Sequence, residues 1–163
     1  MKKKNIEKTE RTPFTLRQAT AEDLHFLFRV STEAMRPVNK AINPGKIVDL
    51  EKELEIYTAK FDPEEIEVIQ YQDQDVGRLR VVRLAESIYV GGIQILPEYQ
   101  GKGIGTGIFT DLIQESKKSN NPILLEVHNV NSHALSFYIK LGFEKSGKTD
   151  TQTILQFGHY QCL

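Results

Sequence analysis

The stretch ILPEYQGKGIGTGIF, which runs from Ile95 to Phe109, has a glycine at every second position through its centre. These glycines are Gly101, Gly103, Gly105 and Gly107. A proline precedes them, and the residues that follow have the apolar spacing of a helix. Glycine lets a ligand approach the backbone closely, and a helix N-terminus exposes about four unpaired N–H groups with a partial positive charge. The stretch therefore predicts an anion-binding loop between a strand and a helix, most often a loop for phosphate.

Two common phosphate-binding patterns do not fit this loop. A P-loop requires G-x-x-x-x-G-K-[ST], but Leu96 occupies the first glycine position and Gly103 the Ser/Thr position. The dinucleotide pattern G-x-G-x-x-G fails from each of three starting glycines, because its last position is Thr106, Ile108 or Thr110. The sequence therefore excludes both nucleotide-binding interpretations.

A third pattern, Q/R-x-x-G-x-G/A, is met by Gln100, Gly103 and Gly105. With these residues the loop resembles the acyl-CoA pyrophosphate loop of the GNAT superfamily of N-acetyltransferases. Taken alone, a glycine-rich hexamer is equally compatible with a turn that only lets a strand pack against a helix. The choice between the two interpretations depends on the sequence downstream.

A second segment, LLEVHNVNSHALSFYIKLGFEKSGK, resembles the next GNAT motif, in which a set of residues follows a strand. The matching residues are Asn131, Ala134, Tyr138, Gly142 and Phe143. Asn131 and Tyr138 are seven residues apart, close to two helical turns, so both lie on one helix face with the small Ala134 between them. A slender chain such as pantetheine has room to lie along that face. Asn131 is also a candidate N-cap, and Tyr138 alone would be interpreted as a core aromatic.

Together the two motifs identify the chain as a member of the GNAT superfamily, of the small single-domain bacterial type, over roughly residues 14 to 160. The resemblance implies a mixed α/β sheet that is splayed around the acyl-CoA site. It implies transfer of an acetyl group from the co-substrate acetyl-CoA, without a metal, to a primary amine by direct attack in a ternary complex. The amine would belong to a small molecule or to a peptide or protein, and a homodimer is left open. The alternative is a non-catalytic acyl-CoA-binding module of the same fold.

The hydrophobic pattern independently predicts an α/β domain whose sheet combines antiparallel hairpins with one parallel crossover through the glycine-led helix. Residues 1–12 are expected to form a solvated tail, and residues 13–163 a single domain. The elements are expected in the order β-α-α-β-β-β-α-β-α-β-β. Strands are predicted at 14–20, 65–72, 76–86, 87–96 and 122–128 and in a C-terminal hairpin, and helices at 20–37, 47–61, 104–118 and 131–142. Pro37 is expected to end the first helix, and 73–75 to form a turn.

The resemblance assigns the co-substrate to the loop and to the strand before it. Backbone N–H groups from Gly101 to Thr106 would bind the pyrophosphate, with the Thr106 hydroxyl as a further donor and Lys102 either near a phosphate or simply solvated. The strand backbone would pair with the pantetheine arm, and Gly91-Gly92 favour a bulge or a close backbone approach there. The predicted co-substrate-binding residues are Ile93, Gln94, Ile95, Gln100, Gly101, Lys102, Gly103, Ile104, Gly105, Thr106, Asn131 and Tyr138.

Three residues are candidates for proton transfer. Tyr138 is the predicted general acid, because in the family this tyrosine lies beside the sulfur of the leaving thiolate. Glu126 is the first candidate for the base that deprotonates the amine, since ribosomal-protein acetyltransferases of the superfamily have a catalytic glutamate at the matching position. His128, two residues further along the same strand, points to the same face and is the second candidate. A solvent-facing strand glutamate, or a water chain as the base, remains the alternative.

The composition limits the partners. The chain has 163 residues, 21 of them basic and 22 acidic, so its charge balance gives no case for nucleic acid as a partner. No stretch approaches the ~18 apolar residues of a membrane span. The lone Cys162 predicts neither an internal disulfide nor a metal site, and a cytoplasmic location is expected. Acidic residues along 49–67 would favour a cationic amine acceptor if they lined the site, but a solvated helix face is the simpler interpretation. In the family that the chain resembles, the first two helices and their loop line the acceptor site, so the resemblance implies that residues 35–46 determine acceptor specificity.

Overall fold

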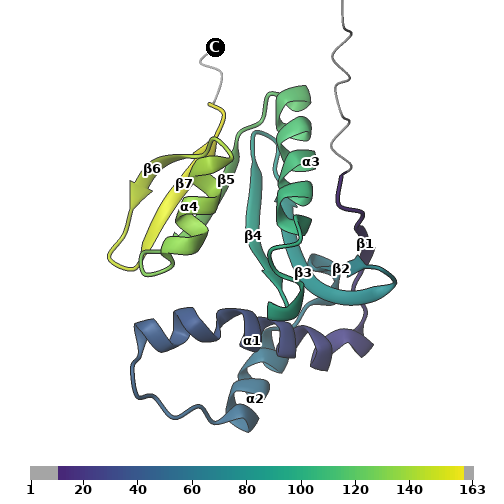
Figure 1. Cartoon of the computed structure of the whole chain (residues 1–163), viewed down its shortest axis with the longest axis vertical. Helices are drawn as coiled ribbons and strands as arrows, with labels where there is room; N and C mark the ends of the chain where they lie inside the picture. The colour runs from purple at the N-terminus through teal and green to yellow at the C-terminus, as the bar shows by residue number, and fades with distance from the viewer. Residues whose placement is uncertain (1–10, 160–163) are drawn as a thin grey trace, which may run out of the picture.

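The structure is a computed structural model that describes residues 11–159, so most of the expected tail and Cys162 lie outside the described residues. The helices are α1 (Leu24–Ile42), α2 (Leu50–Lys60), α3 (Ile104–Ser119) and α4 (Ser132–Lys140). The strands are β1 (Thr15–Gln18), β2 (Glu67–Tyr71), β3 (Gln74–Arg83), β4 (Ile88–Ile95), β5 (Ile123–His128), β6 (Glu144–Lys148) and β7 (Gln152–Phe157). This order of helices and strands is the predicted one (Figure 1).

The strands form one mixed sheet in the order β1-β2-β3-β4-β5-β7-β6. All neighbouring pairs are antiparallel except β4 and β5, which are parallel and connected through α3. The predicted combination of hairpins with one parallel crossover is therefore confirmed. Because ligands of α/β sheets bind at the carboxyl ends of parallel strands, the β4–β5 pair is where a site is expected.

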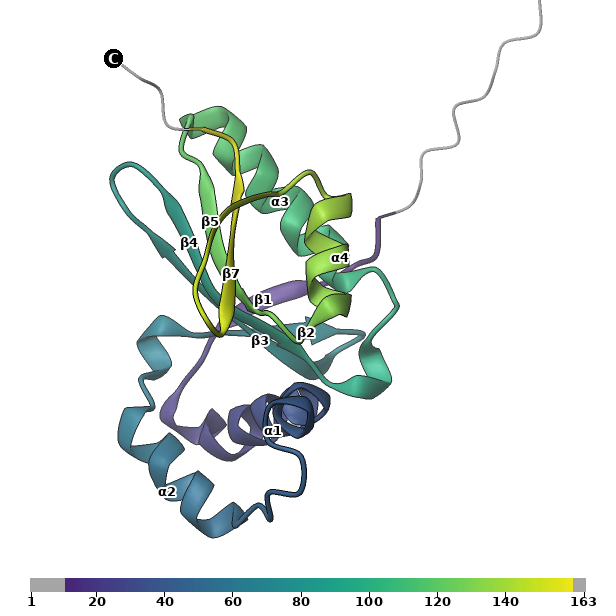
Figure 2. The same ribbon diagram turned by 90° about the vertical axis from the view of Figure 1, so that its left-hand side faces the viewer.

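The helices cover the two faces of the sheet separately: α3 and α4 lie on one face, and α1 and α2 on the other (Figure 2). The main core lies under α3 and α4, where the fully buried Phe109 packs with Val90 of β4 and Leu125 of β5. A smaller cluster around Leu27 and Val68 joins α1 to the other face. No helix in the described part of the chain is long and apolar enough to cross a membrane.

The first helix differs from its prediction at its C-terminus. A short 3-10 helix (Ala21–Asp23) precedes its first residue, Leu24, and the expected capping box begins that turn, where the Thr20 N–H donates to the Asp23 carboxylate at 2.8 Å. However, Pro37 does not end the helix, which continues to Ile42. Pro37 is exposed, so water can satisfy the carbonyl that loses its helical bond, and the extra turn buries Val38.

The second helix is shorter and less buried than its apolar stripe indicates. The helix begins after Asp49, whose side chain caps it, so Ile47 lies outside it and is 93% exposed. No residue of α2 is fully buried. Tyr57 of α2 packs against α1, with its ring centroid 5.5 Å from that of Phe28, and against Phe61 at the end of its own helix, at 5.9 Å.

Candidate functional site

The sheet opens between β4 and β5. The parallel pairing runs only from Ile88 with Ile123 to Val90 with Leu125, and no described strand pairs with this side of β4 beyond Val90. The register of β3 against β4 shifts at the same level, leaving Gly91 as the extra residue of a bulge. The bulge expected at Gly91-Gly92 is therefore present, and it lies where the two strands begin to separate.

The segment Ile93–Ile95 forms one wall of this opening. Ile93 and Ile95 pack their side chains against the main core, while the Gln94 side chain lies on the opposite face, over Gly92. Because β5 no longer pairs with this part of β4, the backbone edge is available to an extended ligand, as in strand addition. The geometry fits the prediction that a pantetheine arm pairs with these residues.

The glycine-rich loop connects β4 to α3 and presents unpaired donors. Gly101 and Gly103 have positive φ angles, 72° and 81°, which glycine adopts without the penalty of a Cβ. Within residues 11–159, none of the six backbone N–H groups from Gly101 to Thr106 donates to another residue. The first helical bond is donated by Gly107 to Gly103. The loop thus has the donor set of an anion site at the N-terminus of a long helix.

Two features of the loop explain residues that the pattern alone leaves open. The Gln100 side chain donates to the Ile95 carbonyl at 2.8 Å, so it braces the loop against the end of β4. Gly107 lies inside the first turn of α3, where a Cβ would lie only 2.9 Å from the Phe14 ring. Close packing against Phe14, which directly precedes β1, therefore accounts for a glycine that otherwise destabilises the helix by up to ~1 kcal/mol. Thr12, which precedes β1, also contacts the loop, because its hydroxyl donates a hydrogen bond to the Lys102 carbonyl.

Helix α4 begins at the carboxyl end of β5, facing the loop. The Asn131 side chain accepts a bond from the Ala134 N–H at 3.1 Å, which confirms it as the N-cap. Tyr138 is buried among aromatic rings, with centroids 5.1 Å from Phe109 and 5.5 Å from Phe143. Burial raises the pKa of the Tyr138 hydroxyl above its ordinary value, so the phenol remains protonated at neutral pH.

Glu126 and His128 lie on β5 just beyond the point where β4 departs. Leu125 and Val127 point into the core under α3 and α4, so alternation places Glu126 and His128 on the opposite face, as predicted. Glu126 is exposed, and His128 is partly buried. The structure therefore places the two candidate bases and Tyr138 on opposite faces of the sheet, flanking the β4–β5 opening.

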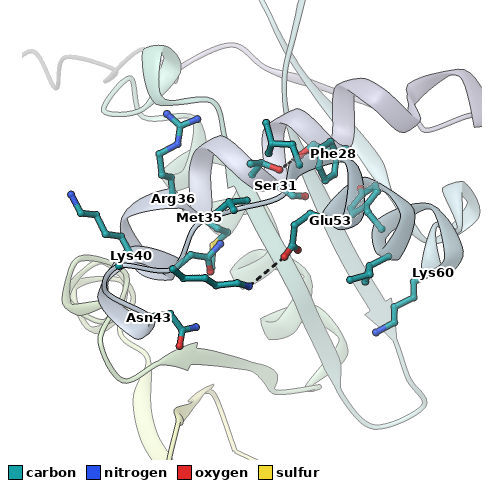
Figure 3. A pocket seen from close by; sticks show the side chains of 16 residues that line it. Phe28, Ser31, Met35, Arg36, Lys40, Asn43, Glu53 and Lys60 are labelled. Atoms are coloured by element: carbon teal, nitrogen blue, oxygen red, sulfur yellow. Dashed lines mark hydrogen bonds and ion pairs between the residues drawn. The ribbon is translucent and has the colours of Figure 1, made fainter.

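A cavity of about 890 Å³ lies between α1, α2 and the loop that joins them. Figure 3 shows Met35, Arg36 and Lys40 extending from α1, and Glu53 and Lys60 extending from α2. Residues 35–46, which the sequence analysis associates with acceptor specificity, supply about half of the lining. The cavity lies on the same face of the sheet as Glu126, His128 and Gln94.

The sequence does not predict two polar groups near this cavity, one from a residue of its wall and one from a residue that bonds to Ser31 of that wall. The Tyr57 hydroxyl and the Arg78 Nε are both buried without a hydrogen-bond partner in the described part of the chain. The segment VGRLRVV alternates polar and apolar residues, which predicts that Arg78 faces away from the core but not that α1 covers it.

Comparison with known families identifies the class of protein that this fold and site define. A family model of the acetyltransferase (GNAT) domain matches residues 62–145, just over half of the chain. The chain therefore belongs to the GNAT acetyltransferase family. No curated protein matches the chain significantly in sequence.

Solved structures with the same fold include several N-acetyltransferases. The PaiA N-acetyltransferase of Thermoplasma acidophilum, in complex with coenzyme A, is 20% identical with a TM-score of 0.71 over 90% of this chain and 99% of that one. The ribosomal-protein-S18-alanine N-acetyltransferase of Escherichia coli is 16% identical with a TM-score of 0.62 over 92% and 96%. Arabidopsis thaliana Naa50, in complex with the bisubstrate analogue CoA-Ac-MVNAL, is 20% identical with a TM-score of 0.57 over 90% and 99%. At these identities the similarity establishes the fold.

Proposed function

We propose that this protein transfers an acetyl group from acetyl-CoA to a primary amine by direct attack in a ternary complex. The observation that carries the proposal is the run of six unpaired backbone N–H groups from Gly101 to Thr106, beside a sheet that opens at the same end. A pyrophosphate accepts hydrogen bonds from such donors and is favoured by the positive end of α3. That PaiA was solved with coenzyme A supports the assignment.

In this proposal the opening orients the co-substrate. The pyrophosphate lies on the loop, with the Thr106 hydroxyl and Lys102 as further donors, and the pantetheine arm follows the backbone of Ile93, Gln94 and Ile95 towards Gly91-Gly92. Asn131 contacts the arm from the N-terminus of α4. The thioester then lies in the opening, where it is accessible from both faces of the sheet.

The reaction forms one bond and breaks one. The neutral amine nitrogen attacks the thioester carbonyl carbon, the C–S bond breaks, and the nitrogen gives up one proton while the thiolate takes up one, so that the products are the N-acetylated amine and free coenzyme A. An alkyl ammonium has a pKa near ~10, so it must first lose a proton to a base. We assign this step to Glu126, with His128 as the second candidate, because both lie on the face of the α1–α2 cavity through which an acceptor enters.

Tyr138 acts on the opposite face, at the departing sulfur. A thiol with a pKa near ~8.5 is a stronger acid than any tyrosine, and burial raises the pKa of Tyr138 further. We therefore assign to Tyr138 a hydrogen bond that stabilises negative charge as the C–S bond breaks. The thiolate that leaves needs little further help at neutral pH.

The proposal is tested by measuring free coenzyme A release with acetyl-CoA and a panel of amines, amino acids and N-terminal peptides. Tyr138→Phe is expected to lower kcat by about 10- to 1,000-fold with unchanged coenzyme A affinity, and Glu126→Gln to lower it by about 100-fold or more. Glu144→Gln, on the exposed strand β6, is the control and should leave turnover unchanged. A wild-type protein that binds coenzyme A but acetylates no amine would instead be a non-catalytic acyl-CoA-binding module.

A further inference from the structure

The cavity between α1 and α2 is lined by more positive than negative charge. Four cationic side chains and one carboxylate line it: Arg36, Lys40, Lys46, Lys60 and Glu53. Glu53 already pairs with Lys46 across the cavity, at 3.4 Å (Figure 3). No other ion pair within residues 11–159 involves the remaining three cations.

The acidic residues that could attract a cationic acceptor lie elsewhere. Glu51 and Glu55 border a shallow depression on the outer side of α2, and Glu65 pairs with Arg80 at 2.8 Å. The acidic segment 49–67 therefore contributes only Glu53 to the cavity wall. The charge of the cavity favours an anionic group on the molecule that enters it.

A further cation, Arg78, lies behind the cavity wall and reaches it through Ser31, one of the lining residues. It extends from β3 toward α1, where its guanidinium donates to the Ser31 hydroxyl and to the Gln94 side-chain oxygen, both at the long distance of 3.3 Å. Its Nε is buried without a partner, and no carboxylate in the described residues pairs with it. A partly buried charge without a counter-ion is costly, and burial accordingly lowers the pKa of Arg78.

The Tyr57 hydroxyl is a second buried donor on the cavity wall without a partner. Tyr57 comes from α2 and lines the cavity together with Ser31, which accepts the hydrogen bond from Arg78. Two unsatisfied polar groups from different elements, one from a residue of the cavity wall and one from a residue behind it, require an explanation in a folded protein. A planar anion explains both, because a guanidinium binds a carboxylate through parallel N–H donors and a phenol can add another.

We propose that the amine acceptor carries a carboxylate, which binds in the α1–α2 cavity to Arg78 and the Tyr57 hydroxyl. This inference rests on the proposed acetyltransferase function. Arg78 lies opposite Gln94 in the sheet register, and Gln94 belongs to the segment of β4 that is assigned to the pantetheine arm. A carboxylate held there leaves the amine of the same small molecule directed to the β4–β5 opening. Arg36, Lys40 and Lys60 raise the local concentration of such anions.

The test compares acceptors that differ only in the group expected to meet Arg78: a series of small amino carboxylates, the matching neutral carboxamides, and the matching tetrahedral amino phosphonates. We expect kcat/KM to be about 10- to 100-fold higher for the carboxylates than for the carboxamides. Arg78→Gln should remove this preference by lowering kcat/KM for carboxylates while changing that for carboxamides less than about twofold. Arg78→Lys, which keeps the positive charge but not the planar guanidinium, should keep only part of the preference for carboxylates.

Two further variants separate recognition from folding. Tyr57→Phe removes only the hydroxyl and should reduce the carboxylate preference. The control is Arg83→Gln, because Arg83 lies on the same strand as Arg78 but forms its ion pair with Glu115 on α3. Arg83→Gln should keep the preference unchanged. Thermal unfolding and coenzyme A affinity, measured for every variant, identify any that fail to fold.

Several outcomes would overturn the inference. Equal activity of the wild type with carboxylates and carboxamides would overturn the carboxylate inference but not the acetyltransferase function. A preference for phosphonates over carboxylates would have the same consequence. An Arg78→Gln variant that loses activity equally toward all acceptors would place Arg78 at the thioester or in the packing of α1. Absence of turnover with every amine would count against the proposed function itself.

Discussion

Gly101 and Gly103 have similar left-handed backbones, but alanine is expected to have different costs at the two positions. A Cβ at Gly101 would meet no heavy atom within 4 Å, whereas a Cβ at Gly103 would lie 2.7 Å from the Thr12 Oγ. A left-handed conformation costs a non-glycine residue roughly 1–2 kcal/mol, and an overlap in a packed site costs a further ~1–3 kcal/mol. We therefore expect the free energy of unfolding to fall by about 1–2 kcal/mol for Gly101→Ala and by about 2–5 kcal/mol for Gly103→Ala.

Urea denaturation of the full chain, at one pH and without ligand, measures these differences. The Thr12→Ala background provides the decisive comparison, because it removes the hydroxyl that the new methyl group would meet. In that background the additional cost of Gly103→Ala should fall to the ~1–2 kcal/mol expected for Gly101→Ala. If Gly103→Ala costs no more than Gly101→Ala, or if Thr12→Ala does not narrow the gap, the reasoning about this contact is wrong.

Three further predictions concern single residues. Gly107→Ala should lower the free energy of unfolding, measured in urea, by about 1–2 kcal/mol because its methyl group meets the Phe14 ring. In a Phe14→Leu background the ring is gone, so the same substitution should cost less or become stabilising through the higher helix propensity of alanine. Asn131→Ala should lower the free energy of unfolding by about 1 kcal/mol through the lost N-cap, and it should also weaken coenzyme A binding. Asn131→Ser, which keeps a capping side chain, should restore the stability but not the coenzyme A affinity. The Arg17 guanidinium lowers the pKa of Asp23, so the folded state releases this proton at a lower pH than the unfolded state; the stability this provides is present above about pH 4 and is lost as pH falls through the folded pKa. Denaturation at several pH values should show that Asp23→Asn removes this part of the acid sensitivity.

The sequence predicts the frame of the fold because its strongest signals are local. The alternation of strands, the helical spacing after the glycines and the seven-residue spacing from Asn131 to Tyr138 all survive in the structure. The glycine pattern predicts a loop with exposed backbone donors, and the structure has them. The assignment of these donors to coenzyme A and of Glu126 or His128 to proton transfer remains a prediction.

The errors arise where tertiary packing outweighs a local rule. Pro37 would end an isolated helix, but in this fold the burial of Val38 favours a further turn. The sequence places Ile47 on the apolar stripe of the second helix, but the helix begins only after Asp49 caps it, so Ile47 lies outside it and is exposed. Alternation along a strand shows which residues share a face but not which of them another element covers, so the sequence does not predict the partial burial of Arg78.

The central claim is that the loop after β4 binds the pyrophosphate of a CoA thioester while the open edge of β4 binds its arm. Backbone amide chemical shifts, followed while the full chain is titrated with coenzyme A, test it most directly. The account predicts that the largest saturable shifts occur at the amides of Gly101 to Thr106 and of Ile93 to Ile95, with little change on β1 or β6. Binding that leaves these amides unchanged, or no binding at all, would contradict it.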